Sequence, residues 1–454
     1  MQKKLRLTAA LYIAALAMIS GCSTPQAPAD KTENPQADAL EASDKKTEKI
    51  ANAQLTKVNN IPGIADPNNP EPTINGEIEQ YIKNLTEKGF SSQTQGVWMQ
   101  AGNTLLANYR GTIPLPAASV TKVATSLAAL QTFGPEHRFV TTIGATGSIE
   151  NGVLKGDLIV QGGEDPLFVW EEAIALGNTL NQMGIQKVTG NLLVAGKFYM
   201  NFKTSPQVSG NFLKQALDSK NWPQQVEKQY LTLPPSTAKP QITIDGKVKT
   251  ISVIPSNVKT LVRHNSFPLA ELLKRMNRYS NNYMADMIAN SVGGAKIVAQ
   301  KAAQTAGVPQ NEIKLVNGSG LSVDNRISPR AATAMFLAIE RYLAAYQMSI
   351  GDVFAIVGKD EGTLDKRNLP SLVIVKSGTL NNVSSLAGTF PTQQQGNVWF
   401  AIMNVGENTD ELRLQQESLL SSFLQKWGEV TSLPAEFIPN PLIQTKTSGS
   451  EIVN

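Results

Sequence analysis

The chain has 454 residues, with 41 basic and 37 acidic side chains and a formal net charge of +4. This length predicts about two or three domains, and the near balance of charge, without a dense basic stripe, argues against nucleic acid as a partner. One cysteine and two histidines exclude a disulfide framework and make a Cys/His metal site improbable. A Ser-His-Asp triad would need His137 or His264, and neither lies in a recognisable motif, so we expect both to be structural.

The N-terminal segment has the pattern of a secretory signal. Basic residues precede an apolar run from Leu7 to Ile19 that is shorter than a membrane-spanning helix. The "ISGC" that follows resembles a bacterial lipobox with Cys22, the only cysteine, as acceptor; a plain signal with a chance cysteine is the alternative. We therefore expect residues 1–21 to be a lipoprotein signal peptide. The mature protein would then be exported to the periplasm or cell envelope and anchored to a membrane by acyl chains on Cys22.

Two flanking segments are too polar to bury a core. From Ser23 to Gln80 there is no Phe, Trp or Tyr, and Pro, Ala, Gln and charges of both signs alternate. Such a segment cannot bury enough apolar surface to offset its ordering entropy, so residues 22–75 are predicted to be a flexible tether after the lipidated cysteine. The same argument predicts a disordered tail over residues 436–454.

The sequence between these ends alternates strand and helix patterns. "GVWMQ" and "TLLANYR" look like paired strands, and a helix follows from Ser119 to Gly134. Short β-rich segments then surround one helix over residues 141–259. After two further helical stretches, "SLVIVKSGTL", "SSLAGTF" and "NVWFAIMNV" look like consecutive antiparallel strands. We predict an α+β fold whose main domain combines residues 76–140 and 260–435, with a β-rich domain over residues 141–259 inserted into it.

The first motif is Ser119-x-x-Lys122. Ser-x-x-Lys also occurs at Ser43, Ser236 and Ser256, but only Ser119 opens a long apolar helical pattern. There the i,i+3 spacing places Ser119 and Lys122 on one face, and the helix N-terminus favours an anion nearby. A serine nucleophile beside its own base is one interpretation, and a serine that only caps the helix is the other. This motif alone does not separate them.

Two further motifs follow in the chain. Ser280-Asn281-Asn282 is a Ser-x-Asn pattern, which also occurs elsewhere by chance. Lys376-Ser377-Gly378 is the only Lys-[Ser/Thr]-Gly and comes directly after the apolar "LVIV". A lysine at a strand end, followed by a hydroxyl and a glycine, suits docking of a carboxylate-bearing peptide along a sheet edge. An edge strand with a protective lysine is the alternative.

In this order, the three motifs resemble the catalytic set of penicillin-binding proteins and class A β-lactamases. With the long insertion between the first two motifs, the chain is similar to the D-alanyl-D-alanine carboxypeptidase/endopeptidase group of the penicillin-binding-protein type 4 kind, over roughly residues 96–406. Three stretches along the chain also resemble this group: "ENGVLKGDLIVQGGEDPLF", "NGSGLSVDNRISPR" and "KSGTLNNVSSLAGTF". The resemblance implies a β-lactamase/transpeptidase-like domain. The chain departs from the family at Ser377, usually Thr, at Asn317, usually Asp, and in a shorter insert.

The resemblance also implies a chemistry. The protein would be a serine D,D-peptidase of peptidoglycan stem peptides, working through an acyl-enzyme on Ser119 without metal or cofactor, and β-lactams would inhibit it covalently. Lys122 would be the general base, as a neutral amine whose pKa is lowered by burial and by Lys376. Ser280 would relay a proton to the leaving amine, and Asn282 would orient the peptide.

Substrate binding is implied at the third motif. Lys376 and Ser377 would bind the terminal carboxylate, with Gly378 allowing close approach of the peptide. The oxyanion hole would consist of the backbone N–H groups of Ser119 and Thr379.

Two rival functions share these motifs. A β-lactamase would need a deacylating glutamate between the first two motifs, and the candidate, Glu164, lacks the usual Asn after it. A non-catalytic wall-binding lipoprotein would keep the fold without turnover, but the presence of Ser119 and Lys122 argues against it. Carboxypeptidase and endopeptidase activities use the same chemistry, so the sequence leaves both open.

Overall fold

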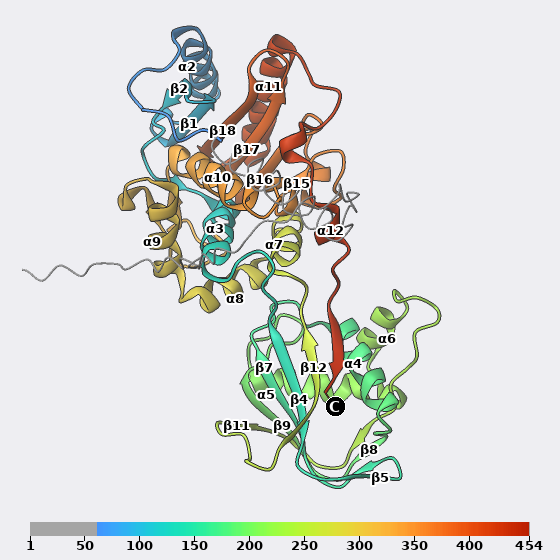
Figure 1. The fold of residues 1–454 in the computed structure, drawn as a ribbon. Helices are drawn as coiled ribbons and strands as arrows, with labels where there is room; N and C mark the ends of the chain where they lie inside the picture. The colour runs from blue at the N-terminus through green and yellow to red at the C-terminus, as the bar shows by residue number, and fades with distance from the viewer. Residues whose placement is uncertain (1–60, 454) are drawn as a thin grey trace, which may run out of the picture. The chain divides into compact units, whose positions relative to one another are not determined.

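The computed structural model describes residues 61–453, shown as the coloured ribbon in Figure 1. The predicted signal peptide, the lipidation site at Cys22 and most of the predicted tether lie outside the described residues. Within the described range, no helix is both long and apolar enough to cross a membrane.

The main domain is built on a six-stranded sheet in the order β15-β16-β17-β18-β1-β2. Every neighbouring pair in it is antiparallel, which confirms the predicted N-terminal hairpin and the three predicted consecutive strands near the C-terminus. The sheet therefore uses both ends of the chain, as an α+β fold with an insertion requires. Its strands are β1 (Gln95–Ala101), β2 (Thr104–Tyr109), β15 (Ala355–Ile356), β16 (Ile374–Leu380), β17 (Val383–Thr392) and β18 (Gly396–Val405).

Helices cover both faces of this sheet (Figure 1). Alternate residues of β18 enter two different cores, because successive side chains of a strand point to opposite faces: Trp399 packs in one and Phe400 in the other. One face is covered by α2 (Pro72–Glu87) and α11 (Thr409–Trp427). The helices that share the other core are α3 (Thr121–Phe133), α7 (Leu269–Arg278), α8 (Asn282–Val292), α9 (Ala295–Ala306) and α10 (Pro329–Ala344).

Helix α3 runs through the centre of the second core. Every residue from Thr121 to Leu130 is buried, so the helix is enclosed on all sides rather than on the single apolar face that the sequence pattern indicates. Two of its buried hydroxyls have partners: Thr125 Oγ1 donates to the carbonyl of Gly318 at 2.7 Å, and Ser126 Oγ accepts from Asn277 at 3.0 Å. Strand β3 (Leu115–Pro116), just before this helix in the chain, forms a short sheet with β13 (Ile313–Lys314) and β14 (Arg326–Ile327), which come much later.

The segment between β4 and β12 has its own core and two sheets of its own. Parallel pairs such as β7–β9 and β9–β11 and three helices make it a mixed α and β unit. The larger sheet contains β11 (Val248–Ile251), β9 (Leu192–Lys197), β7 (Leu158–Gly163), β4 (Val140–Ala145), β12 (Lys259–Asn265) and β19 (Gly449–Ile452). The smaller sheet and the helices are β10 (Thr243–Ile244), β8 (Lys187–Val188), β6 (Val153–Leu154), β5 (Ile149–Glu150), α4 (Trp170–Gln182), α5 (Pro206–Leu217) and α6 (Gln224–Tyr230).

Part of the predicted tether, residues 61–75, belongs to the folded main domain. Helix α2 begins at Pro72, where Glu71 caps it by accepting from the N–H groups of Thr73 and Ile74. Before the helix, the Gln100 amide donates to the carbonyl of Gly63 at 2.8 Å. Residues 61–75 are therefore attached to the main sheet. The segment has no aromatic residue, but the cap of Glu71 on α2 and the buried side-chain amide of Gln100 hold it in place.

The predicted disordered tail is wrong for residues 436–453. Phe437, in the 3-10 helix η7 (Ala435–Phe437), is 1% exposed, and α12 (Pro441–Gln444) follows it. Strand β19 then pairs with β12, with Ile452 opposite Val262 (Figure 1). The composition of the tail is polar, but the open edge of β12 supplies the backbone partners that it needs.

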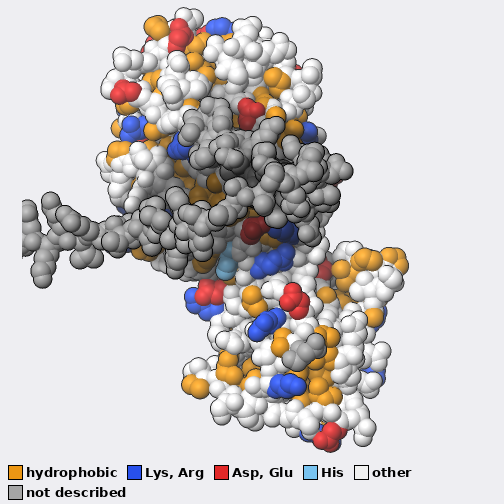
Figure 2. Space-filling view, viewed as in Figure 1, with side chains coloured by type: hydrophobic (Ala, Val, Ile, Leu, Met, Phe, Trp, Pro, Cys, Tyr) orange, Lys and Arg blue, Asp and Glu red, His pale blue; other side chains and the backbone are white. Residues whose placement is uncertain are grey.

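Charge is mixed on the visible surface. Among the described residues that are visible in Figure 2, Lys and Arg side chains are interspersed with Asp and Glu side chains.

Candidate active site

Ser119 lies in a single 3-10 turn, η2 (Ala118–Val120), immediately before α3. Its backbone is held from both sides: the carbonyl of Ala117 accepts from Ser385 Oγ at 2.6 Å, and Ala118 has a φ of 45°, a conformation that L residues rarely adopt. Helix α3 begins without a side-chain cap hydrogen bond. The Ser119 hydroxyl instead accepts from Lys122 Nζ at 2.9 Å, so its partner is the lysine and not the helix end.

Two glycines let other segments approach this turn. A Cβ on Gly378 would lie 2.8 Å from the Ser119 nitrogen and 2.3 Å from Ser385 Oγ. A Cβ on Gly320 would lie 1.8 Å from the carbonyl oxygen of Ala118. Only glycine fits at either place, because real Cβ atoms never come this close to backbone. The third motif and the "NGSG" loop therefore both touch the backbone that carries Ser119.

Lys122 is fully buried beneath the serine. Its Nζ has three oxygen neighbours: Ser119 Oγ at 2.9 Å, Asn282 Oδ1 at 2.7 Å and the carbonyl of Ser319 at 2.8 Å. Burial lowers the pKa of Lys122 to about 7, and the negative charge of Asp286 opposes this shift. A substantial fraction of the side chain is thus a neutral amine at neutral pH.

The second motif forms the turn between α7 and α8. Ser280 has a φ of 52°, Asn281 caps α8 by accepting from the N–H of Met284 at 3.1 Å, and Asn282 is the first residue of the helix. The cap fixes the start of α8 and so directs Asn282 Oδ1 to Lys122. The three consecutive residues have three different structural roles.

Lys376 lies on β16 and is 1% exposed. Its Nζ donates to Ser280 Oγ at 3.2 Å and to the carbonyl of Ser377 at 2.6 Å. Burial, with the charge of Lys122, lowers the pKa of Lys376 well below its usual value. The expectation that Lys376 binds the substrate carboxylate therefore does not match this geometry, because its amine is buried against Ser280.

These motifs open into a cavity of about 310 Å³. It brings together the hydroxyls of Ser119 and Ser280 and the third-motif residues Ser377 and Thr379, while Lys122, Lys376 and Gly378 support these groups without lining it. The full lining is Ser119, Ser280, Asn282, Thr363, Lys366, Arg367, Ser377, Thr379 and Arg413.

Four of the lining residues were not identified by sequence reasoning. Thr363, Lys366 and Arg367 come from the loop between β15 and β16, and Arg413 comes from α11. No short motif contains them, and single basic residues in a loop or on a helix are ordinarily solvated surface. Their place in the cavity depends on how the loop and the helix pack around β16.

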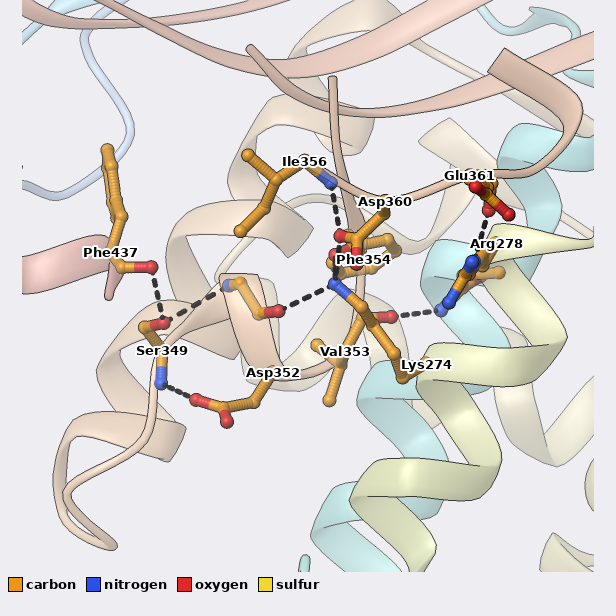
Figure 3. Close-up of polar contacts among 12 residues, drawn as sticks. Lys274, Arg278, Ser349, Asp352, Val353, Phe354, Ile356, Asp360, Glu361 and Phe437 are labelled. Atoms are coloured by element: carbon orange, nitrogen blue, oxygen red, sulfur yellow. Dashed lines mark hydrogen bonds and ion pairs between the residues drawn. The ribbon is translucent and has the colours of Figure 1, made fainter. Parts of the chain in front are cut away.

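The loop that carries three of these residues is tied to α7 (Figure 3). The buried Lys274 Nζ donates to the carbonyls of Gly351 at 2.9 Å and Phe354 at 2.5 Å, and to Asp360 Oδ2 at 2.5 Å. Three residues after Asp360 the 3-10 helix η6 (Thr363–Lys366) begins, and Thr363 Oγ1 donates to the carbonyl of Arg278 at 3.1 Å. The same helix end that leads into Ser280 thus holds the loop.

Residues considered for rival chemistry lie elsewhere. Glu164 forms an ion pair with Lys197 at 2.7 Å and accepts from Ser291, and it does not line the cavity. His137 stacks on Phe133, and His264 is buried in the sheet of the inserted segment. Neither histidine reaches the site, as expected from the sequence.

Comparison with protein families gives one match that covers most of the chain. Residues 78–219 and 230–426 match the D-Ala-D-Ala carboxypeptidase 3 (S13) family. A D-alanyl-D-alanine carboxypeptidase of Haemophilus influenzae is 24% identical over 410 residues, covering 68% of this chain and 84% of the relative.

Solved structures share the fold. A penicillin-G-acylated predatory endopeptidase from Bdellovibrio bacteriovorus, in complex with an immunity protein, has a TM-score of 0.65 at 21% identity and covers 78% of this chain and 99% of its own. Penicillin-binding protein 4 from Haemophilus influenzae has a TM-score of 0.57 at 22% identity, with 77% and 99% covered. These likenesses extend over the main domain and the inserted segment together.

Proposed function

Because the chain belongs to the D-Ala-D-Ala carboxypeptidase 3 (S13) family, it is a serine-type D,D-peptidase, and we propose that Ser119 is its nucleophile toward peptidoglycan stem peptides. The observation that supports this best is the 2.9 Å contact between Ser119 Oγ and the buried Lys122 Nζ, at the floor of a cavity. In the proposed reaction Ser119 Oγ forms a bond to the carbonyl carbon of the penultimate D-Ala, and the peptide C–N bond breaks.

Lys122 is the proposed general base. A neutral amine has two N–H groups and one lone pair. Its two N–H groups are accounted for by Asn282 Oδ1 and the carbonyl of Ser319, which leaves the lone pair for the Ser119 hydroxyl proton. The lowered pKa supports this assignment, since an amine with a pKa of about 7 is available as a base at neutral pH.

Ser280 and Lys376 are proposed to deliver a proton to the leaving amine. Ser280 Oγ lines the cavity and accepts from Lys376 Nζ at 3.2 Å. The hydroxyl can give its proton to the amine and regain one from the ammonium form of Lys376. The proton that Lys122 took from Ser119 then makes up the one that Lys376 lost, so that the net transfer is from Ser119 to the leaving amine. Asn282, which also lines the cavity, is proposed to orient the peptide.

The proposed peptide-binding edge is the second half of β16. Strand β15 pairs only with Ile374 and Val375, so within the described chain the edge from Lys376 to Leu380 has no strand beside it on that side. A peptide can extend along this edge, with Ser377 and Thr379 lining its path and Gly378 allowing contact with Ser119. The N–H groups of Ser119 and Thr379 are the proposed oxyanion hole.

Inhibition and location belong to the same proposal. β-Lactams should trap Ser119 as a stable adduct, because they present a strained amide to the same nucleophile.

The "ISGC" pattern at Cys22 supports an exported lipoprotein that works in the cell envelope at the end of a tether. Water would complete the cycle by hydrolysing the acyl-enzyme, with either a terminal D-Ala or a crosslinked diamino acid as the leaving group.

Intact-mass measurement tests the nucleophile. The chain beginning at Ser23 is mixed with penicillin G beside its Ser119→Ala variant, and we expect a one-to-one adduct on the parent alone. Rapid loss of the drug without a lasting adduct would favour a β-lactamase instead. Neither adduct nor turnover, in a folded protein, would exclude Ser119 as nucleophile and favour a wall-binding role.

A further inference from the structure

One wall of the active-site cavity is cationic. Lys366 and Arg367 come from the loop held by α7, and Arg413 comes from α11, while no carboxylate is among the lining residues. Arg413 Nη2 donates to Thr379 Oγ1 at 2.9 Å, so this guanidinium lies beside the residue that follows the third motif. Two elements far apart in sequence thus place positive charge at one end of the cavity.

Part of this charge has no fixed partner. Arg413 pairs with Asp410, but that carboxylate is 87% exposed, so the pair is weak and can be replaced by a ligand. Arg413 Nε is buried and has no hydrogen-bond acceptor within the described chain. Lys366 is exposed, and no ion pair involving it is found among the described residues.

Arg367 supports the same conclusion from a more buried position. Its side chain is 6% exposed and is fixed by Glu417 and by Gln416 Oε1, the latter at 3.2 Å. Its Nη1 is nevertheless buried with no acceptor among residues 61–453. A buried guanidinium N–H without an acceptor is unfavourable. Because Arg367 lines the cavity, its positive charge also attracts an anion there.

The position of the scissile bond indicates which anionic group of the substrate would lie at this cationic wall. With the carbonyl at Ser119 and the leaving amine at Ser280, the carbon next to that amine carries a carboxylate when the leaving group is a terminal D-Ala. A crosslinked diamino acid presents the same group when the carbon that bears its crosslinked amine also carries a carboxylate. Lys376 is buried against Ser280 and is poorly placed to receive it. We infer that Arg413, with Lys366 and Arg367 and beside Thr379, binds the carboxylate next to the leaving amine; this rests on the proposed function.

The part of the wall that comes from the loop, with Lys366 and Arg367, is held in place by the contacts drawn in Figure 3. Lys274 fixes Asp360, and Arg278 donates to the carbonyl of Glu361, directly before the turn that carries Lys366. Because α7 holds this loop and leads into Ser280, one helix sets the distance between Ser280 and the loop part of the wall. That arrangement suits recognition of an amine and a carboxylate that are attached to the same carbon of the substrate.

The test compares penicillin G with its methyl ester, which lacks the carboxylate charge. Acylation rates are measured for the parent, Arg413→Gln and Arg413→Lys. Arg413→Gln should slow acylation by penicillin G about 10- to 100-fold, as expected when a charged hydrogen bond is lost, and leave the ester within about twofold; Arg413→Lys should recover part of the difference. Lys426→Gln removes one positive charge from α11 outside the cavity and should change neither rate.

The outcomes separate the inference from the proposed function. An equal fall for both compounds would make Arg413 merely structural, and no fall for penicillin G would exclude it as the carboxylate site. If the parent is never acylated, the nucleophile assignment fails, but the wall is still tested by calorimetry on Ser119→Ala. That variant should bind acetyl-D-Ala-D-Ala more tightly than its C-terminal amide, and Arg413→Gln should abolish the preference; equal binding would overturn the inference.

Discussion

Lys122 Nζ donates to Asn282 Oδ1 at 2.7 Å, although 160 positions separate the two residues. The contact joins the first motif to the second across the whole inserted segment. This contact is possible because α3 and α8 pack directly against each other in one core. The position of the Lys122 amine therefore depends on the packing of that core. The amine of Lys122, the proposed base, and the side-chain amide of Asn282 are therefore both fixed before substrate binds.

The pH dependence of acylation should report the protonation of Lys122. Only the neutral amine accepts the serine proton, so the acylation rate should rise with pH around a midpoint near the pKa of about 7. Asp286→Asn removes a negative charge that stabilises the ammonium form, so the midpoint should move to lower pH. The variant keeps an Oδ1 acceptor for the N–H of Gly318. Rates of penicillin acylation from pH 5 to 9 measure this, and an unchanged or higher midpoint would contradict the role.

Gly378→Ala should disable the site without unfolding the protein. The added Cβ would meet the Ser119 nitrogen at 2.8 Å and the Ala117 carbonyl at 2.7 Å, so β16 must move away from the nucleophile. We expect acylation to fall by at least about 100-fold, because small misplacements of reacting groups have effects of this size. Gly76→Ala, with nothing within 4 Å, is the matched control. Equal acylation by the two variants would show that close approach is not required.

Asp360→Ala should destabilise the protein through Lys274. The pair is largely buried, with side chains 11% and 19% exposed, and loss of the carboxylate leaves the ammonium with two carbonyls. The expected loss is about 3 to 5 kcal/mol of unfolding free energy, measured by urea denaturation. Arg275→Gln breaks a more exposed pair on the same helix and should cost less than about 1 kcal/mol. A loss no greater than that of this control would mean that the pair does not anchor the loop.

Removal of residues 446–454 should loosen the inserted segment. Strand β19 pairs with β12 from Val262 to Asn265, and Ser448 Oγ donates to Glu172 Oε1 at 2.6 Å. Without the strand, β12 becomes an edge, and its amide groups should exchange hydrogen faster while those of β17 keep their protection. Hydrogen exchange by mass spectrometry measures both strands. Unchanged exchange in β12 would show that the pairing contributes little.

Sequence reasoning identified the parts of the site that lie in short motifs. The spacing at a helix start identifies the pair Ser119 and Lys122, and the spacing at a turn identifies the pair Ser280 and Asn282. The strand pattern of "LVIVKSG" places Lys376 at the end of a strand. The structure brings these residues together, and their catalytic roles stay predictions. The antiparallel order of the last three strands was also readable, because their alternating apolar pattern is strong.

The remaining features depend on tertiary packing. The carbonyl of Ser319 that holds Lys122 is a backbone atom, and no side-chain pattern reveals it. Arg413 faces the cavity only because α11 packs beside β17 and β18. The departure at Asn317 also has a local account: its Oδ1 accepts from the N–H of Gly320 at 2.9 Å and from Asn325 at 2.9 Å, which an aspartate oxygen could equally do.

Strand β19 has a consequence for the order in which the protein can be completed during synthesis. His264 of β12 and Ser450 of β19 are hydrogen-bonded at 3.0 Å but separated by 186 positions. A ribosome therefore delivers the inserted segment long before the strand that finishes its sheet, and in the interval the edge of β12 is open to other chains. The main sheet, which needs β16 to β18 beside β1, is also incomplete until late. Each of the two large sheets thus reaches its final form only after a strand from much later in the chain has been made, β16 to β18 for the main sheet and β19 for the sheet of the inserted segment.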